Sequence, residues 1–481
     1  MSGGTILVLQ MQRMGDLVLT FPLILWLARK HPTYGIHVVA EKSFSHPLLP
    51  VSPHAAYIDT KDALSGALNG KGYRLLINLS VREEAASLAG TLQSEEVIGP
   101  VRGQDGALRV RGDWQLYRTS LVQNNRHNRF HWADLNALDL VPPQLMQKTR
   151  YDPPRDATRK LADGSPGKEA KTVGVFVGAS EPAKRPDAAF YARLLRELLD
   201  RGLRPVLLGG PADVPVAQEI RSLFAHPALD LVGKLSLAEL VTVGRTLGLF
   251  ITPDTGPMHV AAWTGIRTLN LSVGNVNPWE TGPFQPGHLV LRANTSCARG
   301  CWACTQKTQL CRRALTPGRV AALAAIALRG PQQRLERLGM PGLRLLATGR
   351  TQQGLYELLP LGAAQTGPAP GAEDLAGEFW RAYFLWRLAG ADAPPVREAW
   401  AKLAEFQPRL TDALRGTLPD LGRRIALLAA EGLRPRALLA GSLPFWRPLA
   451  GYLEAVLENE DASPQAIRRC LEHVEALAGI L

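Results

Sequence analysis

The chain alternates short apolar strands with amphipathic helices, and it does so in two separate runs. The first run opens with the strand TILVLQ (5–10), a helical segment (16–31) and a second strand (35–41). The second run opens with the strand TVGVFVG (172–178) and an amphipathic helix (187–202). Because parallel strands need long crossover connections, this alternation predicts two parallel sheets with helices on both faces. The chain is therefore expected to contain two Rossmann-like α/β domains.

A polar segment separates the two runs. Residues 151–171 are charged and rich in proline and glycine, a composition typical of a linker. We expect domains at 1–150 and 172–330 that face each other across a cleft, where ligands commonly bind. At 481 residues the chain has room for a third unit.

Beyond about residue 331 the sequence favours helices alone. Segments 377–390, 394–407 and 464–481 repeat apolar residues at helical spacing, and turns rich in proline and glycine separate them. We expect residues 331–481 to form an all-α extension, whose role the sequence does not indicate.

The net charge of +12 lies in the first 330 residues, since acidic and basic residues are equal in number after that. A basic body favours acidic partners such as nucleotide phosphates, phosphorylated glycans or an anionic membrane surface. Nucleic acid is not expected, because no recognition helix or aromatic RNA-binding strand is seen. The sequence shows no signal peptide or bilayer-spanning run, and its clustered cysteines indicate a reducing cytoplasm.

The segment PDTGPMHVAAWTG (253–265) follows an apolar strand and opens a helix. Amides around Thr255 and Gly256 would point toward the cleft, where the helix dipole favours an anion. His259 would lie one turn further on the same side as Thr255. The same residues also fit a plain capped helix with Asp254 or Thr255 as N-cap and a buried histidine. The segment alone leaves both interpretations open.

Three segments together resemble glycosyltransferase family 9, which includes the lipopolysaccharide heptosyltransferases. DTGPMHVAAWTG is similar to the family's nucleotide-sugar signature, and TILVLQMQRMGDLVLTFPLILWLA to its N-terminal signature. Residues 173–213 are similar to the segment that carries the family's phosphate-binding lysine. The three occur in order and cover about residues 5–320. The resemblance implies a GT-B architecture of two Rossmann-like domains facing a cleft, here with an all-α C-terminal domain.

The resemblance implies catalytic roles for two residues. Asp16 matches the family's base, which would take a proton from the acceptor hydroxyl as it attacks the anomeric carbon. It could also cap the following helix. Lys184 matches the phosphate-binding lysine, whose charge would stabilise the departing nucleoside diphosphate, although a solvated loop lysine is the alternative. Inversion at the anomeric carbon is then implied, and no divalent metal is required.

The donor site follows from the same resemblance. Asp254, Thr255, Gly256 and His259 match the diphosphate-binding turn. Asp213 lies where the family places an acidic residue near the ribose, whose hydroxyls a carboxylate can accept. A simple turn aspartate is the alternative for Asp213.

Arginines of the first domain are the candidates for the acceptor side. Six of them lie within residues 102–129, where they could bind phosphates of a glycolipid or form a solvated face. Arg109 and Arg111 are taken as acceptor-binding candidates. Arg13 is added because it lies near Gln10, where relatives often carry a basic residue.

Four cysteines cluster in one loop. Cys297, Cys301 and Cys304 have the C-x3-C-x2-C spacing of radical S-adenosylmethionine enzymes, and Cys311 follows. That chemistry needs its cysteines near the start of a β/α barrel, whereas these follow the last expected strand. Thiolates at these spacings could hold a structural zinc ion or an iron–sulfur cluster. Reduced thiols without a ligand are the alternative.

The resulting hypothesis is an inverting glycosyltransferase of the cytoplasm, placed at the inner-membrane surface. It would move a sugar, with heptose from ADP-heptose as the first candidate, onto a lipopolysaccharide core or related phosphorylated glycolipid. Another nucleotide sugar with another acceptor is the first alternative. A protein that binds nucleotide sugar or metal without catalysis is the second, but the presence of both Asp16 and Lys184 favours an enzyme.

Overall fold

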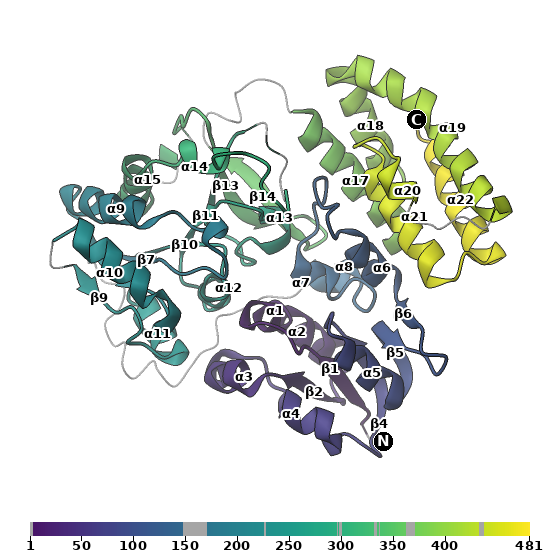
Figure 1. Cartoon of the computed structure of the whole chain (residues 1–481), viewed down its shortest axis with the longest axis horizontal. Helices are drawn as coiled ribbons and strands as arrows, with labels where there is room; N and C mark the ends of the chain where they lie inside the picture. Colours follow the sequence, from purple (N-terminus) through teal and green to yellow (C-terminus); the bar gives the residue numbers. More distant parts are fainter. Residues whose placement is uncertain are drawn as a thin grey trace.

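The computed structural model shows two α/β domains and a group of helices packed beside them (Figure 1). The expected linker 151–171 lies outside the described residues except for Lys171. The structure describes residues 3–147, 171–225, 228–295, 297, 301–330, 334–335, 337–361, 371–431 and 437–481.

The N-terminal domain is built on a six-stranded sheet. Its strands are β1 (Thr5–Leu9), β2 (Gly35–Ala40), β3 (Ala56–Asp59), β4 (Gly72–Asn78), β5 (Gln93–Arg102) and β6 (Leu108–Arg111). They lie in the order β3-β2-β1-β4-β5-β6, and only the β5–β6 pair is antiparallel. Val8 of β1 and Ile77 of β4 are completely buried, because helices cover both faces of this sheet.

The C-terminal domain is built on an eight-stranded sheet. Its strands are β7 (Thr172–Phe176), β8 (Arg204–Leu208), β9 (Leu229–Asp230), β10 (Leu249–Pro253), β11 (Thr268–Ser272), β12 (Leu289–Ala293), β13 (Leu343–Arg350) and β14 (Tyr356–Leu361). They lie in the order β14-β13-β12-β11-β10-β7-β8-β9. The strands from β7 to β12 pair in parallel, as the alternating sequence pattern predicted.

β13 and β14 contradict the expectation that strands end near residue 330. Both are antiparallel additions to the sheet, and β13 pairs Leu345 with Leu291 of β12. Buried and partly exposed residues are mixed along β13, so it lacks the continuous apolar run that marks a buried parallel strand. The helices that follow these two strands begin, within the described residues, at Ala372.

Helices pack around each of the two sheets, and a further group of helices forms a third unit (Figure 1). The N-terminal domain contains α1 (Met14–Val18), α2 (Phe21–Lys30), α3 (Lys42–Leu48), α4 (Thr60–Asp62), α5 (Glu83–Thr91), α6 (Asp113–Ser120), α7 (Trp132–Leu135) and α8 (Pro143–Gln147). The C-terminal domain contains α9 (Ala188–Asp200), α10 (Val214–Leu223), α11 (Leu237–Gly244), α12 (Gly256–Trp263), α13 (Pro278–Thr281), α14 (Leu310–Arg313) and α15 (Pro317–Arg329). The third unit, called the helical region below, contains α17 (Ala372–Ala389), α18 (Pro394–Phe406), α19 (Pro408–Glu431), α20 (Ala437–Ala440), α21 (Arg447–Asn459) and α22 (Pro464–Ala478).

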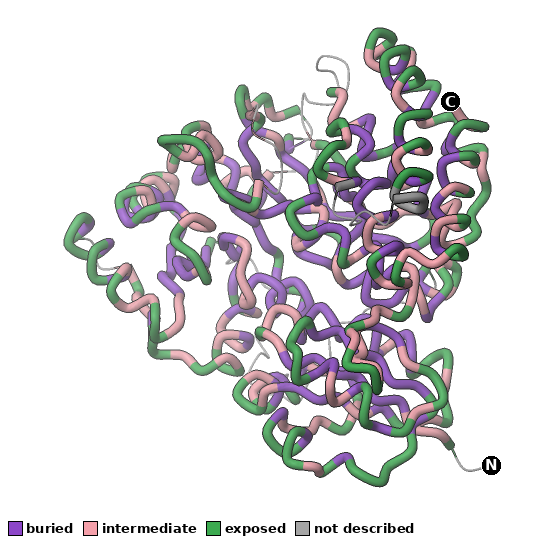
Figure 2. The backbone as a smooth tube through the Cα atoms, turned by 45° about the vertical axis from the view of Figure 1, so that its right-hand side comes forward, coloured by how far each residue is buried: buried purple, intermediate pink, exposed green. Residues whose placement is uncertain are grey.

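One hydrophobic core joins the N-terminal domain, the outer strands of the second sheet and the helical region. Trp26 of α2, Tyr356 of β14 and Trp380 of α17 all belong to it and are buried. Buried backbone accordingly continues across this junction (Figure 2). A separate core fills the space between the second sheet and helices α9 and α15. The helical region is therefore an integral part of the molecule and not a loosely attached appendage.

Candidate active site

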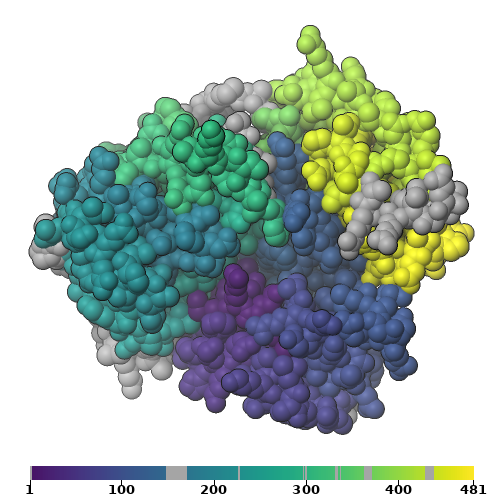
Figure 3. All heavy atoms as spheres, viewed as in Figure 1, coloured from purple at the N-terminus to yellow at the C-terminus, as the bar shows by residue number. Residues whose placement is uncertain are grey.

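The two α/β domains touch where the start of α1 meets the start of α12. Gly15 and Gly256 allow this close approach, because neither carries a side chain. A Cβ atom on Gly15 would lie 3.1 Å from Cδ2 of His259, and one on Gly256 would lie 2.5 Å from Cε of Met14. The surface is hollowed between the teal and green second domain and the purple and blue parts of the first domain (Figure 3). Asp16 follows Gly15 and so lies beside the first turn of α12.

Asp16 has the environment of a base whose affinity for protons is increased. It lies in the first turn of α1, but the N-cap position belongs to Arg13, so the alternative of Asp16 as N-cap is not what the structure shows. Burial raises the pKa of Asp16 above its ordinary value, while the charges of Arg118 and then Arg13 oppose the rise. A raised pKa brings a carboxylate closer to the working pH, where it accepts a proton more effectively.

Arg118 of α6 is the strongest electrostatic partner of Asp16. Its guanidinium donates to the Leu79 carbonyl at 3.2 Å and lies 4.4 Å above the Trp132 ring. Burial lowers the pKa of Arg118 to about 10, which leaves the group charged at neutral pH. The sequence showed Arg118 as one of six similar arginines, and no local pattern distinguishes it from the others.

The first turn of α12 presents the positive end of a helix to the cleft. The side chain of Thr255, the N-cap residue, does not cap the helix. Pro257 occupies the first turn, as the sequence suggested. The dipole and N–H groups at such a helix start attract anions.

Asp254 and His259 lie beneath this turn. Oδ2 of Asp254 accepts a hydrogen bond from the Thr281 hydroxyl, and Oδ1 lies 3.9 Å from Nε2 of His259. Burial raises the pKa of Asp254 to about 6, and the Thr281 hydroxyl and then the Lys184 charge oppose the rise. Burial lowers the pKa of His259 to about 4, so this histidine is neutral at pH 7. The negative charge of Asp16 also raises the pKa of Asp254, so the two carboxylates lie close enough to influence each other.

Lys184 lies at the end of the short helix η4 (Pro182–Lys184), and its charge reaches Asp254. Its Nζ pairs with Glu181 at 3.1 Å, and the lysine side chain is partly buried. The backbone of this turn packs against Gly274, where a Cβ atom would lie 2.4 Å from the Ala183 carbonyl oxygen. Gly274 also has φ +77, a conformation that favours glycine. The loop after β11 therefore fixes the position of Lys184.

Asp213 stands at the carboxyl ends of β7 and β8. It ends the short helix η5 (Pro211–Asp213), and its Oδ2 accepts a hydrogen bond from the Gly210 amide at 2.8 Å. Burial raises the pKa of Asp213, with the Gly210 amide and then Arg185 opposing the rise. Gly178 of the neighbouring strand end leaves room for this carboxylate, which a Cβ atom there would meet at 2.1 Å. Strand ends of this kind are where open parallel sheets bind ligands.

The three arginines expected on the acceptor side lie in two different places. Arg13 precedes α1 and its charge reaches Asp16, so it borders the cleft. Arg109 lies in the edge strand β6 and pairs with Asp461 of the helical region at 2.6 Å. Arg111 is exposed at the end of the same strand. The structure thus brings Arg13 to Asp16 and places Arg109 in a contact with the helical region.

A buried polar contact also joins the two α/β domains. Glu280 of α13 accepts hydrogen bonds from Asn125 at 2.7 Å and Asn128 at 3.0 Å. Asn277 in turn donates to the Asn125 carbonyl at 3.0 Å. Burial raises the pKa of Glu280 to about 8. Sequence reasoning missed this set, because its members lie about 150 residues apart and form no motif.

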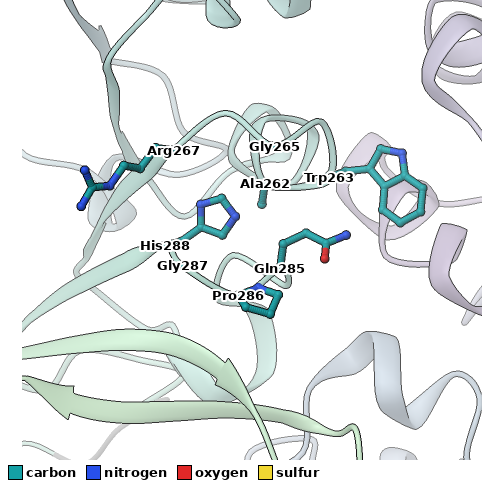
Figure 4. Close-up of a pocket in the computed structure, with 8 residues that line it drawn as sticks. All are labelled: Ala262, Trp263, Gly265, Arg267, Gln285, Pro286, Gly287 and His288. Carbon is teal, nitrogen blue, oxygen red and sulfur yellow. The ribbon is translucent and has the colours of Figure 1, made fainter. Parts of the chain in front are cut away.

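A cavity of about 280 Å³ lies at the other end of α12 (Figure 4). The indole of Trp263 in its wall donates to the Val51 carbonyl at 2.6 Å and meets Phe21 edge-on at 5.4 Å. This contact adds an apolar link between the two domains. None of the residues expected in the site lines this cavity. The lining residues are Ala262, Trp263, Gly265, Arg267, Gln285, Pro286, Gly287 and His288.

The cysteine loop lies beside the Lys184 loop. Sγ of Cys311 accepts a weak hydrogen bond from the Gly274 amide at 3.3 Å. Burial raises the pKa of Cys301, and the neighbouring Cys304 and Cys311 raise it further. Within the part of the chain that the structure describes, no three His, Cys, Asp or Glu side chains converge as a metal site would require.

Metal binding by these cysteines stays a prediction. Zinc or iron held by Cys297, Cys301, Cys304 and Cys311 would appear as about one metal ion per chain in protein purified without chelators. Elemental mass spectrometry measures this, and replacing Cys301 by serine is expected to lower the content. Metal-free wild-type protein from cells supplied with both metals would contradict the prediction.

Comparisons with known proteins identify the family of this chain. The model of glycosyltransferase family 9 (heptosyltransferase) matches residues 62–310. The chain is 32% identical over 129 residues to lipooligosaccharide heptosyltransferase 2 of Haemophilus influenzae, an alignment that spans 26% of this chain and 37% of that relative. It is 26% identical over 310 residues to lipopolysaccharide heptosyltransferase 2 of Escherichia coli K12, spanning 60% of this chain and 88% of that relative.

A solved structure shows the same fold. The family 9 glycosyltransferase of Veillonella parvula superposes with a TM-score of 0.51 at 20% sequence identity, covering 68% of this chain and 97% of that one. Two Rossmann-like sheets with an added helical region, as expected, are therefore confirmed. Because the family model spans more than half of the sequence, the chain belongs to glycosyltransferase family 9, the heptosyltransferase family.

Proposed function

We propose that this chain is an inverting glycosyltransferase that moves heptose from ADP-heptose onto a hydroxyl of a lipopolysaccharide core or a related phosphorylated glycolipid. The observation that carries the proposal is the meeting of α1 and α12, which puts the Asp16 carboxylate beside the start of a helix suited to an anion. The names of the heptosyltransferase relatives support the choice of sugar.

In the proposed reaction each group has one task. The donor diphosphate lies at the first turn of α12, and Lys184 balances the charge that grows on it as the bond to the sugar breaks. Asp16 takes the proton of the acceptor hydroxyl. The hydroxyl oxygen attacks the anomeric carbon from the side opposite the departing diphosphate, which inverts the configuration of that carbon. Asp213 accepts hydrogen bonds from the ribose hydroxyls.

The acceptor and the location follow from charge. The basic residues of the first 330 positions suit a phosphorylated glycolipid and the anionic surface of the inner membrane at its cytoplasmic face. Arg13 lies closest to the proposed base among the three arginines expected there. Among the helices of the described residues, none has the length and apolar character needed to cross a bilayer.

A transfer assay tests the proposal. Purified protein is incubated with ADP-heptose and with a series of lipopolysaccharide cores that are truncated before or after each heptose. The masses of the products are then measured by mass spectrometry. A mass gain of one heptose on one of these cores supports the proposal. Transfer only from UDP-glucose or GDP-mannose, run in parallel, would keep the enzyme class and overturn the donor.

Replacing Gly274 by alanine is expected to disturb the Lys184 loop. The new methyl group would meet the Ala183 carbonyl oxygen, and the positive φ adds strain of about 1–3 kcal/mol. We expect weaker binding of ADP-heptose by calorimetry and a lower midpoint of denaturant unfolding. Gly287→Ala is the matched control, because it has φ +91 with no atom within 4 Å of the new Cβ. Equal donor affinities in the two variants would contradict the role given to Gly274.

A further inference from the structure

The helical region forms hydrogen bonds with residues at the start of α6 and just after the end of α6. At the start of α6, the carboxylate of Asp113 accepts a hydrogen bond from the Arg469 guanidinium of α22. Arg469 is itself held by the Tyr452 hydroxyl at 2.7 Å and by Glu460 at 3.0 Å. After the end of α6, Asn124 donates to the Arg447 carbonyl of α21 at 2.9 Å.

The strand that leads into α6 is held by the same region. Asn459 at the end of α21 pairs with both backbone groups of Val110: its oxygen accepts from the amide at 2.5 Å and its Nδ2 donates to the carbonyl at 3.1 Å. This contact resembles one step of a sheet ladder and covers part of the exposed edge of β6. The ion pair between Arg109 and Asp461 lies beside it.

Side chains between α6 and the helical region pack closely along the helix. Gly451 of α21 lets the backbones approach, since a Cβ atom there would lie 2.4 Å from Nδ2 of Asn124. The rings of Tyr117 and Phe384 lie 4.5 Å apart, and both side chains are buried. α6 is therefore enclosed between the N-terminal sheet and the helical region, with little freedom to shift.

The partly buried guanidinium of Arg118 reaches the carboxyl end of β4, where it donates to the Leu79 carbonyl at 3.2 Å. β1 pairs with β4 and leads into α1, so the charge of Arg118 acts on Asp16 from the neighbouring strand end. Four charged or titratable groups act on or lie near the Asp16 carboxylate: Arg118 on α6, Arg13 before α1, Asp254 after β10 and His259 on α12. His259 is neutral at pH 7, since burial lowers its pKa to about 4. The two arginines are the positive charges that favour the ionised form of Asp16, and Arg118 is the stronger of them.

We propose that the helical region is a positioning element of the active site, which holds α6 on the N-terminal sheet and thereby keeps Arg118 beside Asp16. The inference rests on the proposed function in one respect, the role of Asp16 as base. Arg118 is a positioning residue here, because it acts on the reaction through Asp16. If α6 loosens, the guanidinium leaves Asp16 and the carboxylate becomes harder to ionise.

The test measures the ionisation of Asp16 directly. Protein labelled with ¹³C at the aspartate carboxyl carbons is titrated by NMR, and the Asp16→Asn variant assigns the signal. Arg118→Ala is expected to move the titration midpoint of Asp16 upward by about one pH unit or more. The double variant Asn459→Ala/Arg469→Ala is expected to move it in the same direction, and adding it to Arg118→Ala should give no further shift.

Two controls separate positioning from general damage. Lys402→Ala removes an ion pair with Glu378 inside the helical region, at 2.8 Å, and is expected to leave the Asp16 midpoint unchanged. Arg469→Lys keeps the charge next to Asp113, so the Asp16 midpoint should stay close to its wild-type value. If the double variant does not fold, Arg469→Gln alone takes its place.

An unchanged Asp16 midpoint in a folded helical-region variant overturns the inference, and so does a second shift on top of Arg118→Ala. The readout needs no sugar transfer. If the Asp16 midpoint shifts as expected in these variants but the protein transfers no sugar, the proposed function is rejected and the positioning role is kept.

Discussion

Replacing Asp16 by asparagine is expected to lower the rate of sugar transfer by about 10²- to 10⁴-fold, the usual contribution of a general base. Asparagine has nearly the same shape but cannot take up the proton of the acceptor hydroxyl. ADP-heptose should still bind with nearly unchanged affinity, because the donor contacts come from the α12 turn and the Lys184 loop. Initial rates with saturating donor, together with calorimetry of donor binding, measure both quantities.

The pH dependence of the wild-type rate also tests the role of Asp16 as the base. Burial raises the pKa of Asp16, so the carboxylate is protonated at a higher pH than an ordinary aspartate. Activity should therefore fall on the acid side as Asp16 gains its proton, and this fall should begin at a higher pH than for an exposed carboxylate. Asp62→Asn, an exposed change in the same domain, is the matched control. Full transfer activity in Asp16→Asn would remove Asp16 as the base.

Replacing Lys184 by alanine is expected to affect both binding and chemistry. The loss of a fixed cation beside a departing diphosphate costs about 10²- to 10³-fold in rate when the charge develops in the transition state. The ground-state diphosphate also loses a partner, so the affinity for ADP-heptose should fall as well. Lys184→Arg keeps the charge and should recover part of both losses.

The control for this change is an exposed lysine of the same domain. Lys234 is exposed and donates to the Asp230 carbonyl at 2.8 Å, so Lys234→Ala should behave as wild type. A Lys184→Ala protein with the wild-type rate and donor affinity would show that the lysine only pairs with Glu181.

Local patterns were sufficient to predict that the chain forms two largely parallel sheets and to locate the start of α12. Fully buried parallel strands such as β1 and β10 are apolar at successive positions, and each is followed by a helix with its own periodicity. The Gly-Asp loop at Gly15 and the turn at Gly256 were visible for the same reason, since each lies directly between a strand and a helix.

The antiparallel strands β13 and β14 could not be recognised in this way. Buried and exposed residues are mixed along both strands, so neither has the continuous apolar run that marks a buried parallel strand. The expectation that the strands end near residue 330 was wrong for this reason.

The tertiary contacts of the site were equally hidden. The charge of Arg118 acts on Asp16 only because α6 folds back over β4, and Glu280 meets Asn125 only when the domains come together. Arg109 was expected to face the acceptor, but its partner Asp461 is 352 residues away. Pairings of this kind depend on the packing of whole elements, which a single sequence does not display.

The donor site is tested by calorimetric titration with ADP-heptose, beside UDP-glucose and GDP-mannose. ADP-heptose should bind selectively to the wild-type protein, and this binding should be strongly weakened in Lys184→Ala. Binding of another nucleotide sugar in preference, or binding that does not depend on Lys184, would contradict this assignment of the donor site.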